Sequence, residues 1–331
     1  MPHLLVNRQA LEHNLRTVSE RCRTLGADFM LVFKEAGIRP DLLKFMLDCG
    51  FCSRAGFCHF PGVSLHLPVG VASHLLYLVP DSAIPEVVSG YDVLYQTGIR
   101  SLQRIAKEAR RQQRILRVVL PVEVGDGRDG VLPGELELLA VEMSDLAPHV
   151  ELWGLAANFA CISEQPPKKE DLLRLLALRH AVQERTGRPV PHISVGGSDI
   201  LLLGAESGLP SGITEIRCGT AVYLGVYPLS GQAVPGLSRT AVRLCGQIIE
   251  CSRKNGMLRA VFDFGTNDTN PELVTPPYPG MLFQGASSGY SIFDISDCPV
   301  HMHCGDELLF ELHHRSLARA LATPRVPLCL E

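Results

Sequence analysis

The sequence lacks the features of a membrane protein, a secreted protein and a nucleic-acid-binding protein. Among its 331 residues no apolar run is long enough to cross a bilayer, and the N-terminal MPHLLVNRQ has no signal-peptide pattern. The densest basic cluster, KEARRQQR at residues 107–114, is typical of the solvated face of a helix and is too small for phosphate-backbone binding. We therefore expect a cytoplasmic protein with no membrane or nucleic-acid partner.

Metal-ligand spacing is also absent, although the sequence holds 11 cysteines. Cys49 and Cys52 form one Cys-x-x-Cys pair with Cys58 nearby, but no matching second pair follows at zinc spacing. The odd number and scattered positions of the cysteines do not suit a disulfide scaffold, which is typical of smaller secreted chains. The sequence therefore predicts reduced cysteines and no metal site.

The first two thirds of the chain alternate short apolar runs with amphipathic stretches, which predicts an α/β domain. After a helix that begins at Asn7, strands are expected at residues 29–34, near 77, near 93, and from 115, 152, 192 and 215, with further helices at 40–49, 99–111, 135–147 and 169–186. Repeated β-then-α units favour a parallel sheet, and eight of them would close a (β/α)8 TIM-type barrel. We count seven or eight such units.

The character of the sequence changes after Pro228. The segment SGQAVPGLSR at residues 230–239 is typical of a linker, and strand-like pieces separated by Pro and Gly follow: AVRLCGQIIECS, RAVFDFG, SGYSIFDIS and DELLFEL. A length of 331 residues suits two domains. We predict a barrel domain at residues 1–230 and a smaller all-β domain at residues 231–331.

Lys34 directly follows the apolar run FMLVF at residues 29–33. Barrels of this type place their active sites at the carboxyl ends of the strands, so Lys34 is expected at the active-site end. A partly desolvated lysine amine can form a Schiff base with an aldehyde. A strand-end lysine that only reaches solvent would have the same local sequence.

Two further polar residues follow or end predicted strands. Arg128 lies in VGDGRDG, whose glycines permit a tight loop, and a guanidinium there could bind a carboxylate or phenolate oxygen. Asn158 lies at the end of the strand expected from residue 152 and could hydrogen-bond a ligand. The alternatives are a simple charged turn for Arg128 and a helix cap for Asn158.

The last two strand ends carry a phosphate-binding pattern. Ser198 lies in VGGSD, where backbone N–H groups and a hydroxyl at a strand-to-helix junction suit a phosphate, although plain turns share this sequence. In IRCGTAVYLG, Arg217 and Gly219 have alternate spacing and can both line one end of the barrel, with Gly219 and Thr220 as backbone donors. An ordinary surface ion pair is the alternative for Arg217. Together these residues would bring an amine, two arginines and a phosphate-binding loop to one end of the barrel.

Taken in order, the motifs resemble those of the fold-type-III pyridoxal-phosphate enzymes, the alanine racemase superfamily, and more closely its ornithine-racemase-like branch. VNRQALEHNLRTV followed by LVFK is similar to the family's N-terminal helix and cofactor lysine. GDGRDG resembles that branch's Gly-Asp-Leu-Arg-Glu-Gly, NFAC its Asn-Leu-Gly-Cys, VGGSD its Gly-Gly-Asn-Ser and IRCGTAV its Arg-Ile-Gly-Glu-Ala. Near the end, GTND and GASSGY resemble its Gly-x-Gln-Asp and Gly-Ala-Ser-Ser-Asp-His.

The resemblance implies a pyridoxal 5'-phosphate cofactor and an amino-acid racemase, with ornithine or lysine as the substrate of the close branch. It implies cofactor contacts from Lys34, Arg128, Asn158, Ser198, Arg217, Gly219 and Thr220. Lys34 would carry the cofactor as a Schiff base, and Arg217 would face the pyridine nitrogen. A guanidinium stays charged and donates to that nitrogen without protonating it, which favours reprotonation at the α-carbon over transamination. The family also implies a head-to-tail homodimer in which the β domain of one subunit completes the other's active site.

The second catalytic base is the point where the sequence departs from the family. Thr266 stands where alanine racemase has a tyrosine, and a threonine hydroxyl is too weak an acid for this role. Cys161, Asp268 and Tyr290 are the other candidates, and Tyr290 stands where the close branch has histidine. Cys161 would act if its pKa is lowered and is otherwise a small buried hydrophobe. Gly289 replaces the aspartate of that branch.

Three alternatives to a racemase remain open. A decarboxylase, or another one-base α-carbon enzyme on the same fold, needs no second base. A non-catalytic cofactor carrier would lack the β domain that this chain is expected to have, and a β-rich interaction module on an inactive barrel would bind no cofactor. For a basic substrate, Asp129 or Asp268 could pair with the distal ammonium.

Overall fold

A computed structural model describes residues 1–58, 67–254 and 256–331. The chain divides into two compact units. The β unit comprises residues 1–15, 38–43 and 220–331, and the barrel unit comprises residues 16–37 and 44–219. Among the described residues, no helix is both long and apolar enough to span a bilayer.

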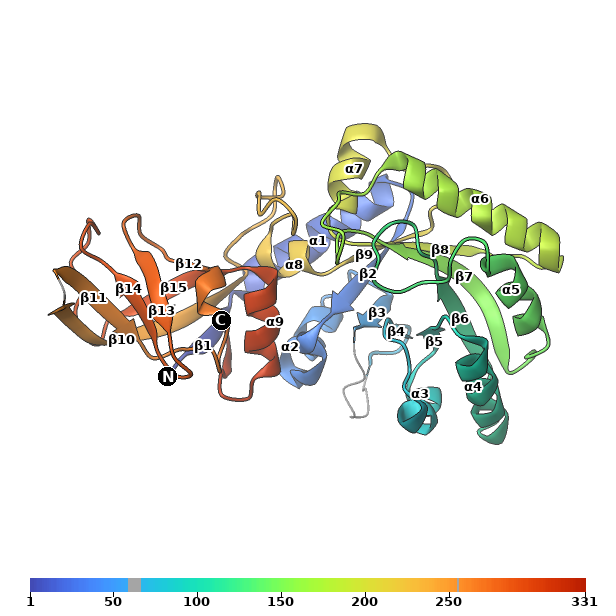
Figure 1. Cartoon of the computed structure of the whole chain (residues 1–331), viewed down its shortest axis with the longest axis horizontal. Coiled ribbons are helices and arrows are strands. Elements are labelled where there is room, and N and C mark those ends of the chain that lie inside the picture. Colours follow the sequence, from blue (N-terminus) through green and yellow to red (C-terminus); the bar gives the residue numbers. More distant parts are fainter. Residues whose placement is uncertain (59–66, 255) are drawn as a thin grey trace. The chain divides into compact units, whose positions relative to one another are not determined.

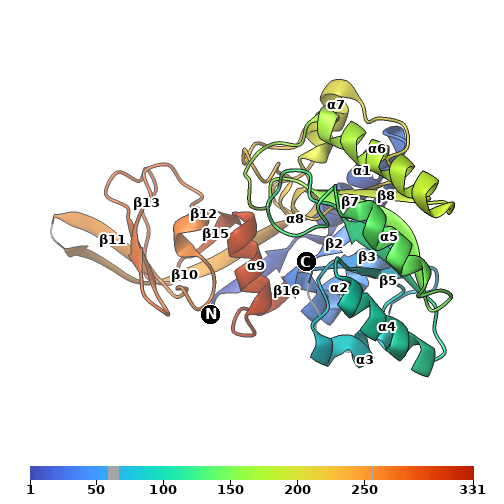
Figure 2. The same ribbon diagram turned by 45° about the vertical axis from the view of Figure 1, so that its right-hand side comes forward.

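The barrel unit contains a closed barrel of eight parallel strands (Figure 1 and Figure 2). In order around the barrel these are β2 (Asp28–Phe33), β3 (Arg54–Phe57), β4 (Ala72–Leu75), β5 (Val93–Tyr95), β6 (Leu116–Pro121), β7 (Val150–Asn158), β8 (His192–Gly196) and β9 (Glu215–Cys218). β9 closes the ring by pairing with β2, so that Asp28 lies opposite Glu215. The predicted α/β class with a TIM-type barrel is confirmed.

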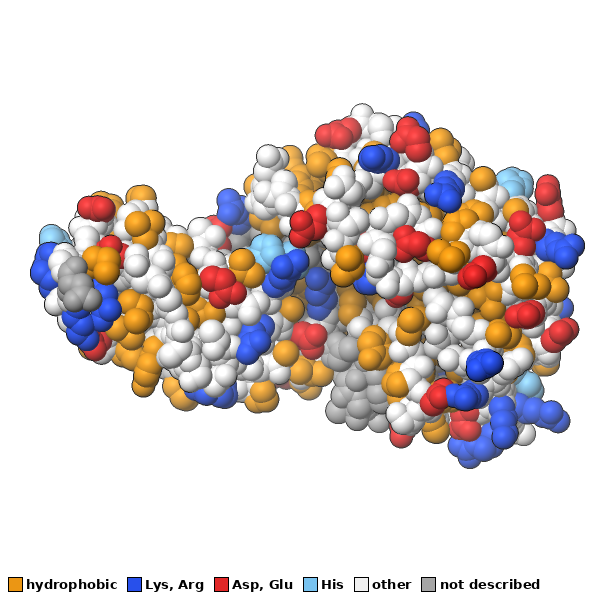
Figure 3. Space-filling model, viewed as in Figure 1, with side chains coloured by type: hydrophobic (Ala, Val, Ile, Leu, Met, Phe, Trp, Pro, Cys, Tyr) orange, Lys and Arg blue, Asp and Glu red, His pale blue; other side chains and the backbone are white. Residues whose placement is uncertain are grey.

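Helices alternate with these strands along the chain. They are α1 (Arg8–Thr24), α2 (Pro40–Asp48), α3 (Ile84–Gly90), α4 (Ile99–Arg111), α5 (Leu136–Ser144), α6 (Lys169–Thr186), α7 (Ile200–Ser207) and α8 (Thr220–Leu224). α4 buries Leu102, Ile105 and Ala109 on one face. Figure 3 shows basic side chains at the surface over α4 with acidic ones beside them, as expected of a solvated helix face.

The strand β2 shows why these segments pair inside a barrel. Five of its six residues, DFMLVF, are buried, which is typical of a parallel strand that is covered on both faces. The strand expected near Tyr77 lies slightly earlier, as β4. β3 was not expected, because its sequence RAGF is short and has no continuous apolar run.

The β unit contains an eight-stranded, mostly antiparallel sheet. The strand order is β12-β15-β10-β11-β14-β13, with β1 paired to β10 and β16 paired to β1. The bounds are β1 (His3–Val6), β10 (Val242–Lys254), β11 (Met257–Phe262), β12 (Val274–Thr275), β13 (Leu282–Ala286), β14 (Ser291–Asp294), β15 (Glu307–Leu312) and β16 (Leu328–Leu330). The helix α9 (His314–Ala322) follows β15. The predicted second domain is therefore present, and its boundary at residue 231 stays a prediction.

The N-terminal residues add a strand that the sequence did not indicate. β1 pairs antiparallel with β10, with Leu4 opposite Leu244, and parallel with β16, with Leu4 opposite Leu328. The helix expected at Asn7 follows at once, and Asn7 caps it by accepting the N–H of Ala10 at 2.8 Å. The first residues of the chain thus belong to the same sheet as the last.

Four phenylalanines form the core of the β unit. Phe262, Phe264, Phe293 and Phe310 are fully buried, and the ring of Phe310 lies 5.1 Å from those of Phe262 and Phe264 and 5.5 Å from that of Phe293. Phe310 meets Phe262 and Phe264 edge to face and Phe293 at a tilt, and such contacts stabilise the β unit beyond the burial of the rings alone.

Candidate active site

Predicted site residues lie at the carboxyl ends of several barrel strands. Lys34 follows β2, Asn158 ends β7, Ser198 comes two residues after β8, and Arg217 and Gly219 lie at the end of β9. Because the strands of the barrel are parallel, these ends meet at one mouth.

Arg217 is buried at this mouth, with only 3% of its surface exposed. Its Nη1 donates to Ser194 Oγ at 2.6 Å, and its Nη2 donates to the carbonyl of Ala157 and to Asn158 Oδ1, both at 2.8 Å. Its guanidinium carbon lies 5.5 Å from the ring centroid of Tyr95, which is on β5. Among the described residues no carboxylate forms an ion pair with Arg217, so the alternative of a surface ion pair is wrong.

Glycines make room beside Arg217. A Cβ on Gly196 would overlap the Arg217 guanidinium and lie 2.6 Å from Asn158 Oδ1, so this position requires glycine. Gly197 has a φ of +102°, which lets the chain turn sharply into Ser198, and Ser198 is buried. A Cβ on Gly219 would lie 3.0 Å from the carbonyl oxygen of Val32. The backbone here can approach a ligand closely.

The loop after β6 brings Arg128 and Cys161 together. Arg128 Nη1 lies 3.4 Å from Cys161 Sγ, and Arg128 Nε donates to Asp129 at 2.8 Å. The buried Asp126 positions this pair, because its Oδ1 accepts the backbone N–H groups of Cys161 at 2.8 Å and of Ile162 at 3.1 Å. Asp129 is therefore already the partner of Arg128.

The Cys161 thiol has a pKa above the ordinary value. Desolvation raises it by more than the neighbouring charge of Arg128 lowers it, although the residue as a whole is exposed. The lowered pKa that the sequence analysis required of Cys161 is therefore not found. At neutral pH this group is a thiol, which can donate a proton but is a poor base.

Three cationic side chains act on a second cysteine, Cys58, which follows β3. Burial raises the pKa of the Cys58 thiol, and the charges of Lys34, Arg128 and Arg217 each lower it in part. Lys34 is half-buried and, among the described residues, makes no hydrogen bond or ion pair. The charges of all three side chains thus act on this one thiol, and their joint role in binding a ligand stays a prediction.

The remaining candidates lie together in the β unit. The backbone N–H of Thr266 donates to Ser287 at 2.9 Å, in the loop that ends at Tyr290, whose side chain is 54% exposed. Asp268 is fully buried; its Oδ2 accepts the N–H of Gly265 at 2.9 Å, and its Oδ1 lies 3.6 Å from Arg325 Nε. Asp268 thus stabilises its own loop, whereas the Tyr290 phenol is open to solvent.

A buried polar cluster that was not among the predicted site residues lies below Arg217. Ser194 Oγ donates to Glu215 Oε1 at 2.5 Å, and Glu215 Oε2 lies 3.2 Å from Arg54 Nη1. Burial alone would raise the pKa of Glu215, but His192, His74 and the Ser194 hydroxyl lower it to about 2. A signal was available in the sequence, because polar residues in HISVG and EIRC occupy alternate positions that share one face of a strand.

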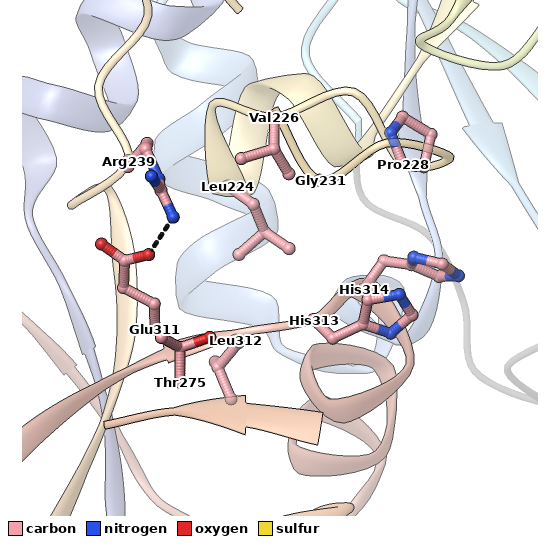
Figure 4. A pocket seen from close by; sticks show the side chains of 10 residues that line it. All are labelled: Leu224, Val226, Pro228, Gly231, Arg239, Thr275, Glu311, Leu312, His313 and His314. Carbon is pink, nitrogen blue, oxygen red and sulfur yellow. Dashed lines mark hydrogen bonds and ion pairs between the residues drawn. The ribbon is translucent and has the colours of Figure 1, made fainter. Parts of the chain in front are cut away.

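A separate small cavity lies within the β unit (Figure 4). It measures about 120 Å³ and is lined by Leu224, Val226, Pro228, Gly231, Arg239, Thr275, Glu311, Leu312, His313 and His314. Arg239 and Glu311 form an ion pair at one side, and the two histidines lie at another. None of the predicted site residues lines this cavity.

Comparison with known proteins supports the resemblance predicted from the motifs. The chain is similar over 97% of its length to ornithine racemase of Acetoanaerobium sticklandii (22% identity, 97% of that protein) and over 98% to lysine racemase of Thermotoga maritima (23% identity, 97% of that protein). Solved structures with the same fold include alanine racemase from Streptomyces coelicolor (TM-score 0.76, 18% identity, 99% of this chain and 97% of that one) and D-threonine aldolase from Filomicrobium marinum (TM-score 0.77, 14% identity, 97% and 89%). Residues 6–228 match the family defined by the N-terminal domain of alanine racemase. The chain therefore belongs to the alanine racemase family.

Proposed function

We propose that this protein is a pyridoxal 5'-phosphate-dependent amino-acid racemase that acts on a basic amino acid such as ornithine or lysine. The observation that carries the proposal is the placement of the amine of Lys34, which has no partner among the described residues, and the buried guanidinium of Arg217 at the carboxyl ends of the paired strands β2 and β9. The full-length similarity to an ornithine racemase and a lysine racemase supports the reaction and the substrate class.

The residues at the mouth fit this cofactor. Its aldehyde requires an amine without a competing partner, and Lys34 has none among residues 1–58, 67–254 and 256–331; its ring nitrogen requires a donor, which Arg217 provides. Its phosphate requires a close approach of the backbone, which Gly197 and the buried Ser198 permit. The family resemblance adds Gly219 and Thr220 at the phosphate, and Arg128 and Asn158 beside the ring.

The chemistry that the cofactor supplies is delocalisation of negative charge from the substrate α-carbon. Lys34 would then move the α-proton on one face. Arg217, which stays charged, would hold the ring nitrogen without protonating it. Arg128, whose Nη2 makes no hydrogen bond among the described residues, would bind the substrate carboxylate or the phenol oxygen of the cofactor.

A proton donor is needed on the opposite face. Cys161 is one candidate, because its raised pKa keeps it protonated and it lies beside Arg128. Tyr290 is the other, supplied by the second subunit of the homodimer that the family resemblance implies; its exposed phenol suits that role. Thr266 would then line the same loop without transferring a proton.

The test starts with purified protein and added pyridoxal 5'-phosphate. We expect a yellow complex that Lys34→Ala abolishes and that Lys44→Ala, a change at an exposed lysine paired with Asp48, leaves intact. Solvent-deuterium exchange at Cα across the twenty amino acids, followed by chiral analysis, should give exchange with inversion on ornithine or lysine. A colourless wild type, or no exchange on any amino acid, would contradict the proposal.

A one-base reaction such as decarboxylation is the second candidate function. It is favoured by one observation, the threonine at position 266 in place of a tyrosine. Release of carbon dioxide from a carboxyl-labelled amino acid would establish it and exclude racemisation as the main reaction.

A further inference from the structure

A chain of polar side chains runs along the inside of the barrel below the mouth. His192 and Ser194 alternate on β8, and Glu215 and Arg217 alternate on β9, and all four are buried. The two strands pair in parallel with Ser194 opposite Glu215. The alternation places the four side chains on the inner face of the barrel, in contact with one another.

The hydrogen bonds in this chain have a fixed direction. An ionised carboxylate only accepts, so the hydroxyl proton of Ser194 is committed to Glu215 at 2.5 Å. The lone pairs of Ser194 Oγ are therefore free to accept from Arg217 Nη1 at 2.6 Å. A serine hydroxyl that could rotate freely would hold the guanidinium less strictly.

The same series of polar side chains also supplies a buried negative charge, which Arg217 does not contact directly. Glu215 is fully buried, and its remaining neighbours are Arg54 at 3.2 Å and His192 at 3.3 Å. His192 and the hydrogen bond from the Ser194 hydroxyl lower the pKa of this carboxyl, so it is ionised at neutral pH. Through one hydroxyl, Glu215 thus acts on the charge of Arg217, in a region where protein dipoles and charges are weakly screened.

We propose that Glu215 is a positioning residue which, through Ser194, fixes the guanidinium of Arg217 for the ring nitrogen of the cofactor. The inference rests on the proposed function, because it assumes that pyridoxal 5'-phosphate binds at this mouth. It assigns a role to two buried residues, Ser194 on β8 and Glu215 on β9, that the predicted site did not include.

The experiment compares four variants with the wild type. Ser194→Ala removes the link to Arg217 but leaves Glu215 bonded to Arg54, and Glu215→Gln removes the charge; the double variant combines them. Asp28→Asn is the matched control, since Asp28 also pairs with Arg54 at 2.8 Å but is 63% exposed. The measurements are the dissociation constant of pyridoxal 5'-phosphate from the apoprotein, the visible circular dichroism of the saturated complex, and the melting temperature.

We expect Ser194→Ala and Glu215→Gln each to raise the dissociation constant roughly tenfold, as expected for losing a charge-assisted hydrogen bond, and to weaken the visible circular dichroism at saturation. The double variant should bind the cofactor no more weakly than the more severe single variant, because the two substitutions interrupt the same series of hydrogen bonds. Asp28→Asn should change neither readout, because exposed ion pairs contribute little.

A purely structural role for Glu215 would lower the melting temperature while leaving the dissociation constant and circular dichroism unchanged, and this result would overturn the proposal. If Glu215→Gln does not fold, the Ser194→Ala variant decides alone. A dissociation constant and a circular dichroism spectrum equal to those of the wild type would then refute the proposed link from Glu215 through Ser194 to Arg217. Failure of the wild type to bind the cofactor would instead refute the proposed function itself.

Discussion

His74 is fully buried inside the barrel, and neither ring nitrogen has a hydrogen-bond partner among the described residues. Desolvation lowers its pKa to about 4. An unfolded histidine titrates near 6.5, so between these values the unfolded chain binds more protons than the folded one. The stability that comes from burying a neutral His74 is therefore complete above pH 6.5 and is lost as the pH falls through 4.

We predict that the free energy of unfolding falls by about 2 kcal/mol between pH 7 and pH 5 because of this one group. His74→Phe, which cannot be protonated, should remove most of that decrease, as measured by urea unfolding at the two pH values. His180→Asn, a change at an exposed histidine on α6, should leave it in place. Glu215, whose pKa is about 2, titrates below this interval. An unaltered pH dependence in His74→Phe would show that another group is responsible.

The sequence predicted the place of single residues where a charged side chain stands at the end of an apolar strand. Lys34 and Arg217 stood out because a charged side chain ended an apolar strand, and the structure places both at the barrel mouth. Glu215 did not stand out, since its role depends on Ser194 and Arg54, which are distant in sequence. The effect of desolvation on Cys161 also depends on neighbours that only the folded chain assembles.

At the scale of elements, the four-phenylalanine core of the β unit offers a direct test. Phe310→Ala removes a ring that touches Phe262, Phe264 and Phe293, and we expect a loss of about 3–5 kcal/mol in the free energy of unfolding. Phe283→Ala, at a ring that is 37% exposed, should cost clearly less. Equal losses in chemical denaturation would show that the cluster is not the core of the sheet.

Long amphipathic helices were predicted well and short strands poorly. α4 and α6 have the bounds expected from the sequence; α4 buries Leu102, Ile105 and Ala109 on one face, and the 18 residues of α6 form a helix long enough to recognise. β3 and β1 have four residues each, and they exist because neighbouring strands supply hydrogen bonds. Such pairing depends on residues far along the chain, which a local pattern does not contain.

At the scale of the whole chain, the sheet of the β unit requires both ends of the sequence. Leu4 and Val6 of β1 are fully buried, and the strand lies between β10 and β16. We predict that removing residues 1–6 destabilises the β unit, because it exposes the edges of two strands and empties two core positions. Limited proteolysis should then cleave within residues 240–331 faster than in the full chain. Loss of residues 1–2 alone, which precede β1, should leave the cleavage rate unchanged.

The position of β1 between an early and a late partner has a consequence for biosynthesis. A ribosome adds on the order of 5–20 residues per second, so the first strand leaves the exit tunnel on the order of tens of seconds before β16 has been translated. For most of that interval HLLV has no β10 to pair with, and for all of it no β16. Nascent chains of this protein therefore carry an apolar segment that chaperones can bind until β10 and β16 are available, while barrel strands made in the meantime already have neighbours with which to fold.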